Sequence, residues 1–106
     1  MTLTEILAKI DQATEKYDTC KIGDTHTQSE ILKEMSTALH FLISHKVDAH
    51  KAWLKAYYEC KEKSATSKEK HADNTVPELY IIRHFMTSGY KIVDSLRTTI
   101  SANKNG

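Results

Sequence analysis

Glycine and proline are scarce in this chain, and this scarcity limits the possible folds more than any other feature. The 106 residues include three glycines and one proline. A sheet protein needs turn residues between its strands, and a nucleotide-binding loop needs clustered glycines. Both classes are therefore excluded. The composition predicts a helical protein with few breaks, and the length suits a single domain, residues 1–106.

The first helix is predicted over about residues 3–20. Thr2 and Glu5 have the spacing of a capping box, in which each side chain satisfies a free backbone N–H at the helix start. Apolar residues follow at steps of three and four, which places them on one face of a helix. Gly23 lies just beyond this run and is the natural stop signal.

The longest periodic run predicts a helix over about residues 28–62, opened by a second capping box at Thr27 and Glu30. Its apolar positions form an a/d heptad pattern that only Lys46 interrupts. Such a helix would be about 50 Å long and needs a partner along its side. Its predicted seam, with Trp53 expected in the core, consists of Leu32, Met35, Leu39, Leu42, Ala49, Trp53, Ala56 and Cys60.

The polar stretch 63–75 loses the periodicity and is predicted to be a loop, with room for a short helical turn near Thr66. Thr75, Pro77 and Glu78 then give a third helix-start signal, for a helix over about residues 76–103. Gly89 lies in its seam, where it allows a neighbouring helix to approach closely. The seam consists of Leu79, Ile82, Met86, Gly89, Val93, Leu96 and Ile100.

These elements predict an all-α fold: a long, antiparallel, coiled-coil-like helical hairpin with an additional N-terminal helix. The first helix is too short to cover both sides of the long one. We therefore expect the heptad seams to serve as core or as contacts in a homo-oligomer.

The sequence contains no motif typical of a catalytic, cofactor-binding or metal-binding site. No catalytic motif or phosphate-binding loop is present, so we expect neither an enzyme nor a cofactor. We expect no metal site, because His40, His45 and His50 are five residues apart and splay around a helix. Cys20 and Cys60 are expected to be free thiols in a reducing cytoplasm, with a disulfide between them as the alternative. The chain lacks a signal peptide and an apolar run of about 18 residues, which favours a cytoplasmic protein without a membrane span.

Charge is distributed unevenly along a nearly neutral chain. Fifteen basic side chains oppose fourteen acidic ones, for a formal net charge of +1. Residues 1–37 hold seven acids and four lysines, whereas residues 44–71 hold seven lysines and four acids. The near-neutral total excludes a simple polybasic protein but conceals a basic segment within the hairpin.

That basic segment carries a second stripe, away from the a/d seam. Lysines beside a tyrosine can neutralise phosphates and stack a base, which suits single-stranded nucleic acid. The alternative is a packing seam against the first helix or another subunit. The stripe consists of Lys51, Leu54, Lys55, Tyr58, Lys61 and Glu62.

Three segments of the hairpin share a pattern with a known family. They are the Lys/Ala-rich run that ends in Tyr57–Tyr58, the later pair Ala72–Asp73, and the segment 94–97 (Asp-Ser-Leu-Arg) near the C-terminus. Over about residues 39–104, the chain resembles the UvsY-type recombination mediators of T-even phages. The resemblance implies a non-enzymatic protein that assembles as ring-like oligomers, binds single-stranded DNA and helps a recombinase displace the single-strand-binding protein.

In this family, basic residues on the long helix contact DNA. The positions that match by pattern are Lys51 and Lys55, with Lys46 and Lys61 on nearby turns. The resemblance thus predicts a recombination accessory protein in the cytoplasm of a bacterial host. The alternatives are a structural coiled-coil subunit and a small helical phage adaptor or inhibitor that contacts a host factor. The adaptor would work through the acidic side chains Glu5, Asp11, Glu15 and Asp18.

Overall fold

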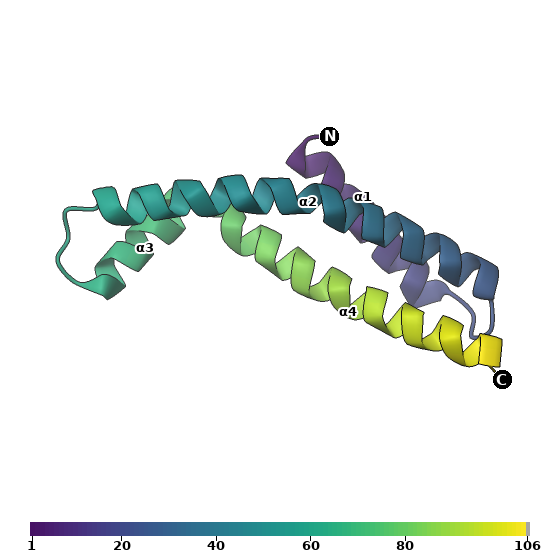
Figure 1. Cartoon of the computed structure of the whole chain (residues 1–106). Coiled ribbons are helices and arrows are strands. Elements are labelled where there is room, and N and C mark those ends of the chain that lie inside the picture. Colours follow the sequence, from purple (N-terminus) through teal and green to yellow (C-terminus); the bar gives the residue numbers. More distant parts are fainter. Residues whose placement is uncertain (106) are drawn as a thin grey trace.

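The computed structural model describes residues 1–105, and side chains as far as Asn103. Within these residues the chain forms four helices and no strand (Figure 1). They are α1 (Leu3–Thr19), α2 (Thr25–Glu59), α3 (Ala65–Thr75) and α4 (Glu78–Asn105). The prediction of an all-α fold built on a long pair of packed helices is confirmed.

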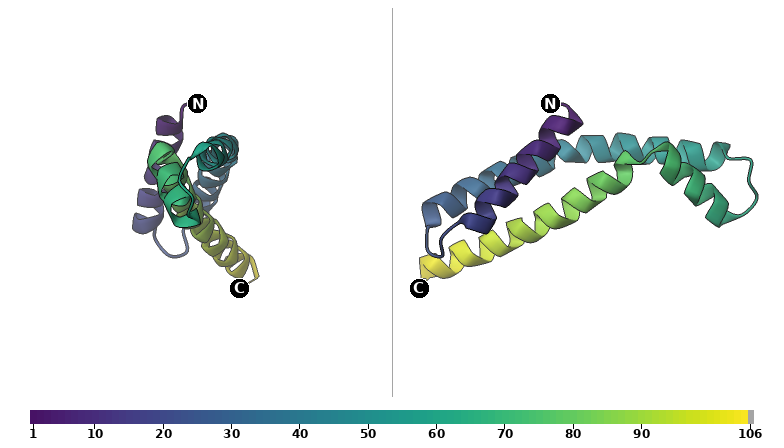
Figure 2. Two further views of the ribbon diagram at one scale, coloured as in Figure 1. Left: turned by 90° about the vertical axis from the view of Figure 1, so that its left-hand side faces the viewer. Right: turned by 180° about the vertical axis from the view of Figure 1, so that it is seen from behind.

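Helix α2 is the spine of an elongated molecule that measures 59 × 25 × 19 Å. Helices α1 and α4 both run antiparallel to α2 and pack along its N-terminal part (Figure 1). Helix α3 lies along the C-terminal part of α2, beyond the start of α4 (Figure 2). The chain thus forms a three-helix bundle at one end and a two-helix projection at the other. This projection, residues 50–75, is called the arm below.

The start of α2 differs from the predicted capping box. Asp24 is the N-cap, and its Oδ1 accepts the backbone N–H of Thr27 at 3.1 Å. The Thr27 hydroxyl donates to Oδ2 of the same carboxylate at 2.7 Å. Both hydrogen bonds to the Asp24 carboxylate satisfy donors of the first helical turn. The helix therefore begins at Thr25, ahead of the predicted residue 28. Gly23, with φ at +91°, makes the turn before the cap.

The predicted loop over residues 63–75 is wrong for most of its length, because Ala65–Thr75 is helix α3. Ser64 caps this helix by accepting the backbone N–H of Ser67 at 3.0 Å. Ala72 is its one buried residue, and a single buried alanine leaves no apolar periodicity to detect.

The junction between α3 and α4 also differs from the prediction. The Thr75 hydroxyl donates to the His71 carbonyl at 2.7 Å, so Thr75 ends α3 instead of capping the next helix. Val76 is buried beside Pro77, and α4 begins at Glu78. The two helices therefore follow one another along α2, where one continuous partner was expected.

The core lies within this single chain. Every predicted a/d position of α2 and α4 is buried or half-buried, Lys46 among the half-buried ones. Helix α1 adds the buried residues Ile6, Ile10 and Ala13, which belong to the same apolar cluster as Ile31 and Ala38 of α2. This second buried row of α2 was not predicted. The heptad seams are thus covered by helices of the same molecule.

Gly89 marks the closest approach of α2 and α4. A Cβ atom at Gly89 would lie 2.8 Å from Cδ2 of Leu39, which is only 1% exposed. Real Cβ atoms do not tolerate such a distance, so Leu39 would have to move within a packed core. Gly89 therefore lets α4 approach Leu39 at this separation, and a larger residue would force the end of the Leu39 side chain to shift.

We expect Gly89→Val to lower the free energy of unfolding by about 1–3 kcal/mol, because the added methyl groups overpack the α2–α4 contact. Chemical denaturation followed by circular dichroism measures this change. Ser88→Val is the control, since Ser88 is the exposed neighbour on the same helix. An equal loss in both variants would contradict the close contact. The double variant Leu39→Ala with Gly89→Val should lose less free energy of unfolding than the sum of the two single variants, because the smaller residue 39 makes room for the valine.

Hydrogen bonds from the hydroxyl and backbone N–H of Thr27 hold the pKa of the Asp24 carboxyl below its ordinary value. A carboxyl whose pKa is lowered in the folded state stabilises the protein above its unfolded pKa of about 4, and this stabilisation disappears as the pH falls through the folded pKa. We expect the Tm to fall less steeply between about pH 5 and pH 2 in Asp24→Asn than in the natural protein. The control is Asp48→Asn, which removes an exposed carboxyl within α2, away from the helix caps, and an equal change of slope in both variants would contradict the role of the cap.

Candidate nucleic-acid interface

Three of the predicted nucleic-acid-binding residues share the outer face of the arm. Lys51, Lys55 and Tyr58 lie four and three residues apart on α2, so they lie within about 60° of one another around the helix. All three are exposed, and Tyr58 is 74% exposed. Lys61 is also exposed and follows in the loop that leads to α3.

Lys46 does not belong to this face. It is half-buried and lies about 140° around α2 from Lys51, on the same side as Leu39, which packs against α4. Lys46 therefore lies apart from Lys51 and Lys55 on α2, and its contact with nucleic acid stays a prediction. A residue at a heptad a position points towards the helix that covers the seam.

Four aromatic side chains form a continuous row along the arm. Ring centroids are 6.4 Å apart for His50 and Trp53, with nearly parallel planes, and 5.4 Å apart for Trp53 and Tyr57, with planes at 20°. The edge of Tyr58 meets Tyr57 at 5.2 Å. We call His50, Trp53, Tyr57 and Tyr58 the aromatic row. Their steps of three, four and one residues signal the row in the sequence, but the prediction considered only Tyr58 as a stacking residue.

Helix α3 covers part of the aromatic row. The indole Nε1–H of Trp53 donates to Oδ1 of Asp73 at 2.8 Å. The Lys68 ammonium lies 5.7 Å from the ring centroid of Tyr57, a cation–π distance. Trp53 is thus half-buried at the edge of the core, with its polar atom paired to α3. Its predicted place in the interior is only partly right.

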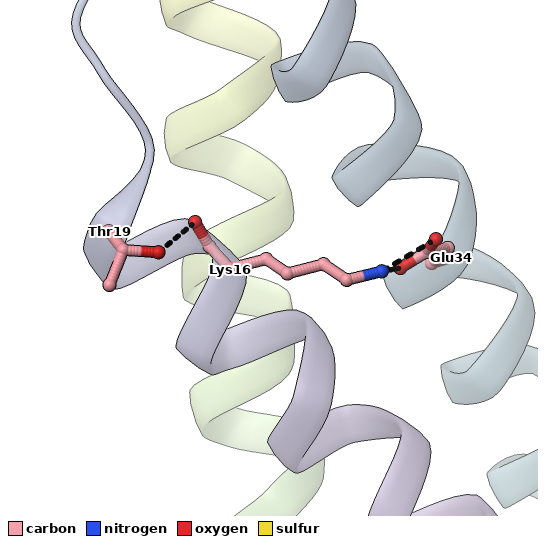
Figure 3. A network of polar contacts seen from close by, with 3 residues as sticks. All are labelled: Lys16, Thr19 and Glu34. Carbon is pink, nitrogen blue, oxygen red and sulfur yellow. Dashed lines mark hydrogen bonds and ion pairs between the residues drawn. The ribbon is translucent and has the colours of Figure 1, made fainter.

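The arm lysines are free of ion pairs in the part of the chain that the structure describes. The two ion pairs there both lie in the three-helix bundle. One joins Lys16 of α1 to Glu34 of α2 at 3.0 Å, and Figure 3 shows this lysine reaching across between the helices. The other joins His26 and Glu30 at 3.2 Å. The arm itself holds six lysines and four acidic residues, so its positive charges remain available to an anion.

An acidic surface lies elsewhere, on α1. Asp11, Glu15 and Asp18 are exposed and lie four and three residues apart, which places them on one side of the helix. Glu5 is exposed on the first turn. The uneven charge of the sequence therefore becomes two separate surfaces, an acidic one on the bundle and a basic one on the arm.

Other candidate sites can be placed briefly. Cys20 and Cys60 are free and half-buried at opposite ends of α2, whose 35 residues span about 50 Å, so a disulfide between them within one chain is excluded. Among the described residues, no three His, Cys, Asp or Glu side chains gather where they could hold a metal ion. None of the helices traced in residues 1–105 has the length and apolarity that crossing a membrane requires.

No protein-family model, curated protein or solved structure matches this chain.

Proposed function

We propose that this protein is a non-enzymatic single-stranded DNA-binding protein and that its arm is the binding surface. The observation that carries the proposal is the exposed ring of Tyr58, held against Tyr57 and flanked on the same face by Lys51 and Lys55. A positively charged surface with exposed aromatic rings is the arrangement that binds single strands.

The mechanism is electrostatic attraction combined with stacking. Lys51, Lys55 and Lys61 neutralise phosphates and release the counterions that these had condensed. Tyr58 offers a ring face to an unstacked base. Contact with Tyr57 restricts the rotamers of Tyr58 before binding, so less side-chain entropy is lost on binding. Every base has a π-face, so the recognition would be tolerant of sequence.

The resemblance to UvsY-type mediators extends this proposal. In that case the protein helps load a recombinase by displacing a single-strand-binding protein, and one of these proteins is its partner. Copies in a homo-oligomer would add their weak sites together. Because the heptad seams are covered within one chain, the copies would have to meet through other surfaces. Exposed apolar side chains for this purpose include Ile43, Val47 and Tyr90.

One observation favours a second function, that of a phage adaptor or inhibitor acting by protein–protein contact. The exposed acidic row of Asp11, Glu15 and Asp18 on α1 is separate from the arm and suits a basic protein surface. Under this alternative, the lysines of the arm are solvated and play no part in binding.

We expect Lys51→Glu combined with Lys55→Glu to abolish binding of a labelled oligonucleotide at low salt, because the face then repels phosphates. Fluorescence anisotropy over a series of salt concentrations measures the affinity and its salt dependence. The matched control is Lys21→Glu with Lys91→Glu, which makes the same change in charge at exposed sites off the arm. This control should retain most of the binding.

Two outcomes would contradict the proposed function. One is the absence of binding by the natural protein at low salt. The other is binding whose affinity does not change with salt, since phosphate contacts require such a dependence. Equal losses in the arm variant and the control would show that total charge matters and that the arm has no special role.

We expect Tyr58→Ala to weaken binding by about 1–3 kcal/mol, roughly 5- to 150-fold, with similar losses on oligonucleotides of different sequence. Tyr58→Phe should bind nearly as well as the natural protein, because it keeps the stacking ring. Tyr80→Ala is the control, since Tyr80 is 78% exposed on α4, outside the arm. Competition binding with unlabelled oligonucleotides provides the comparison. An unchanged affinity in Tyr58→Ala would remove stacking from the mechanism.

A further inference from the structure

The inner rings of the aromatic row are only partly available in the free protein. Trp53 and Tyr57 stack on one another, 5.4 Å apart, and both are half-buried. Their polar contacts are made by α3, through the Asp73 carboxylate on the Trp53 indole and the Lys68 ammonium on the Tyr57 ring. The rings of Trp53 and Tyr57 together offer a larger aromatic surface than Tyr58 alone, and α3 covers part of this surface.

Helix α3 is weakly anchored in this position. It has 11 residues, and Ala72 is its one buried residue. Isolated helices of this length are marginal in water, so α3 depends on its contacts with α2. Non-helical residues flank it at both ends, residues 60–64 before it and Val76 with Pro77 after it. Displacing α3 from α2 would thus leave the packed core of the three-helix bundle in place.

The contacts that α3 makes on the two rings are ones that a nucleic acid can replace. Indole and phenol rings stack well on unpaired bases. A base that stacks on Tyr57 would take the position of the Lys68 ammonium, and this lysine could then pair with a phosphate. The hydrogen bond from Trp53 to Asp73 would be exchanged for water. The neighbouring phosphates of the strand would also repel the Asp73 carboxylate.

We propose that Trp53 and Tyr57 form a second base-stacking site, which α3 covers in the free protein and which a single strand occupies by displacing α3. This inference rests on the proposed function and adds that the arm opens on binding. The closed position of α3 lowers the apparent affinity by the fraction of molecules that are open. Weakening the contact between α3 and α2 should therefore tighten binding.

The test uses Trp53 as an internal reporter, since it is the only tryptophan in the chain. The full-length protein is titrated with unlabelled oligothymidylate while tryptophan emission is recorded, and a labelled oligonucleotide reports binding by anisotropy. We expect the emission of Trp53 to be quenched in parallel with binding. We expect Asp73→Ala to bind about two- to tenfold more tightly, the range that loss of one hydrogen bond to α3 implies.

Two controls separate opening from a change in charge. Glu69→Ala removes one negative charge from an exposed position of the same helix. Asp73→Asn removes the charge of Asp73 but keeps an acceptor for the indole N–H. Both should bind more weakly than Asp73→Ala, and Glu69→Ala should leave the emission of the free protein unchanged. Tyr57→Ala removes half of the stacking site and should weaken binding, with circular dichroism confirming that it remains helical.

The outcomes distinguish this inference from the function on which it rests. Salt-dependent binding that leaves the emission of Trp53 unchanged would overturn the second site while the proposed function survives. The same holds if Asp73→Ala binds no more tightly than Glu69→Ala, or if Tyr57→Ala binds as the natural protein does. If the natural protein does not bind the labelled oligonucleotide at low salt, both proposals fail together.

Discussion

The burial of one side of α2 is the constraint on which the rest of the structure depends. A helix of 35 residues exposes a long apolar seam, and it is stable in water only where other helices cover that seam. Helices α1 and α4 cover the N-terminal part, and Leu39 packs so closely on α4 that a Cβ atom at Gly89 would meet its side chain at 2.8 Å. Helix α3 covers what remains. The position of each of the other helices is set by the part of α2 that it buries.

The bundle and the arm bury α2 to different extents, and this difference explains why the aromatic rings of the arm lie near solvent. The bundle buries residues of three helices in one apolar cluster, whereas α3 contributes Ala72 alone. Rings that would be interior in a longer hairpin are therefore only half-buried in the arm, where Trp53 pairs with Asp73 and Tyr57 faces Lys68. The same feature that makes the arm less stable places aromatic faces and lysines together near solvent. The proposed functions of the arm follow from this arrangement.

Charge separation explains why the overall composition says little about function. The net charge of +1 conceals two separate surfaces, an acidic one on α1 in the bundle and a basic one on the arm. Long-range repulsion between the acidic surface on α1 and a phosphate that approaches the arm is screened over about 10 Å at ordinary salt. An anion close to the arm therefore responds mainly to local charges such as Lys51 and Lys55, and a basic partner can respond to the acidic row on α1.

The sequence alone determined the all-α class and the apolar faces of the helices, since spacing by three and four depends only on local helix geometry. The positions of Lys51, Lys55 and Tyr58 on one face follow from the same geometry. Tertiary structure decided which partner covers each face. It made Ala65–Thr75 a helix through one buried alanine and paired Trp53 with Asp73, twenty residues away. These outcomes depend on contacts between distant segments, whose energies no local pattern of residues records.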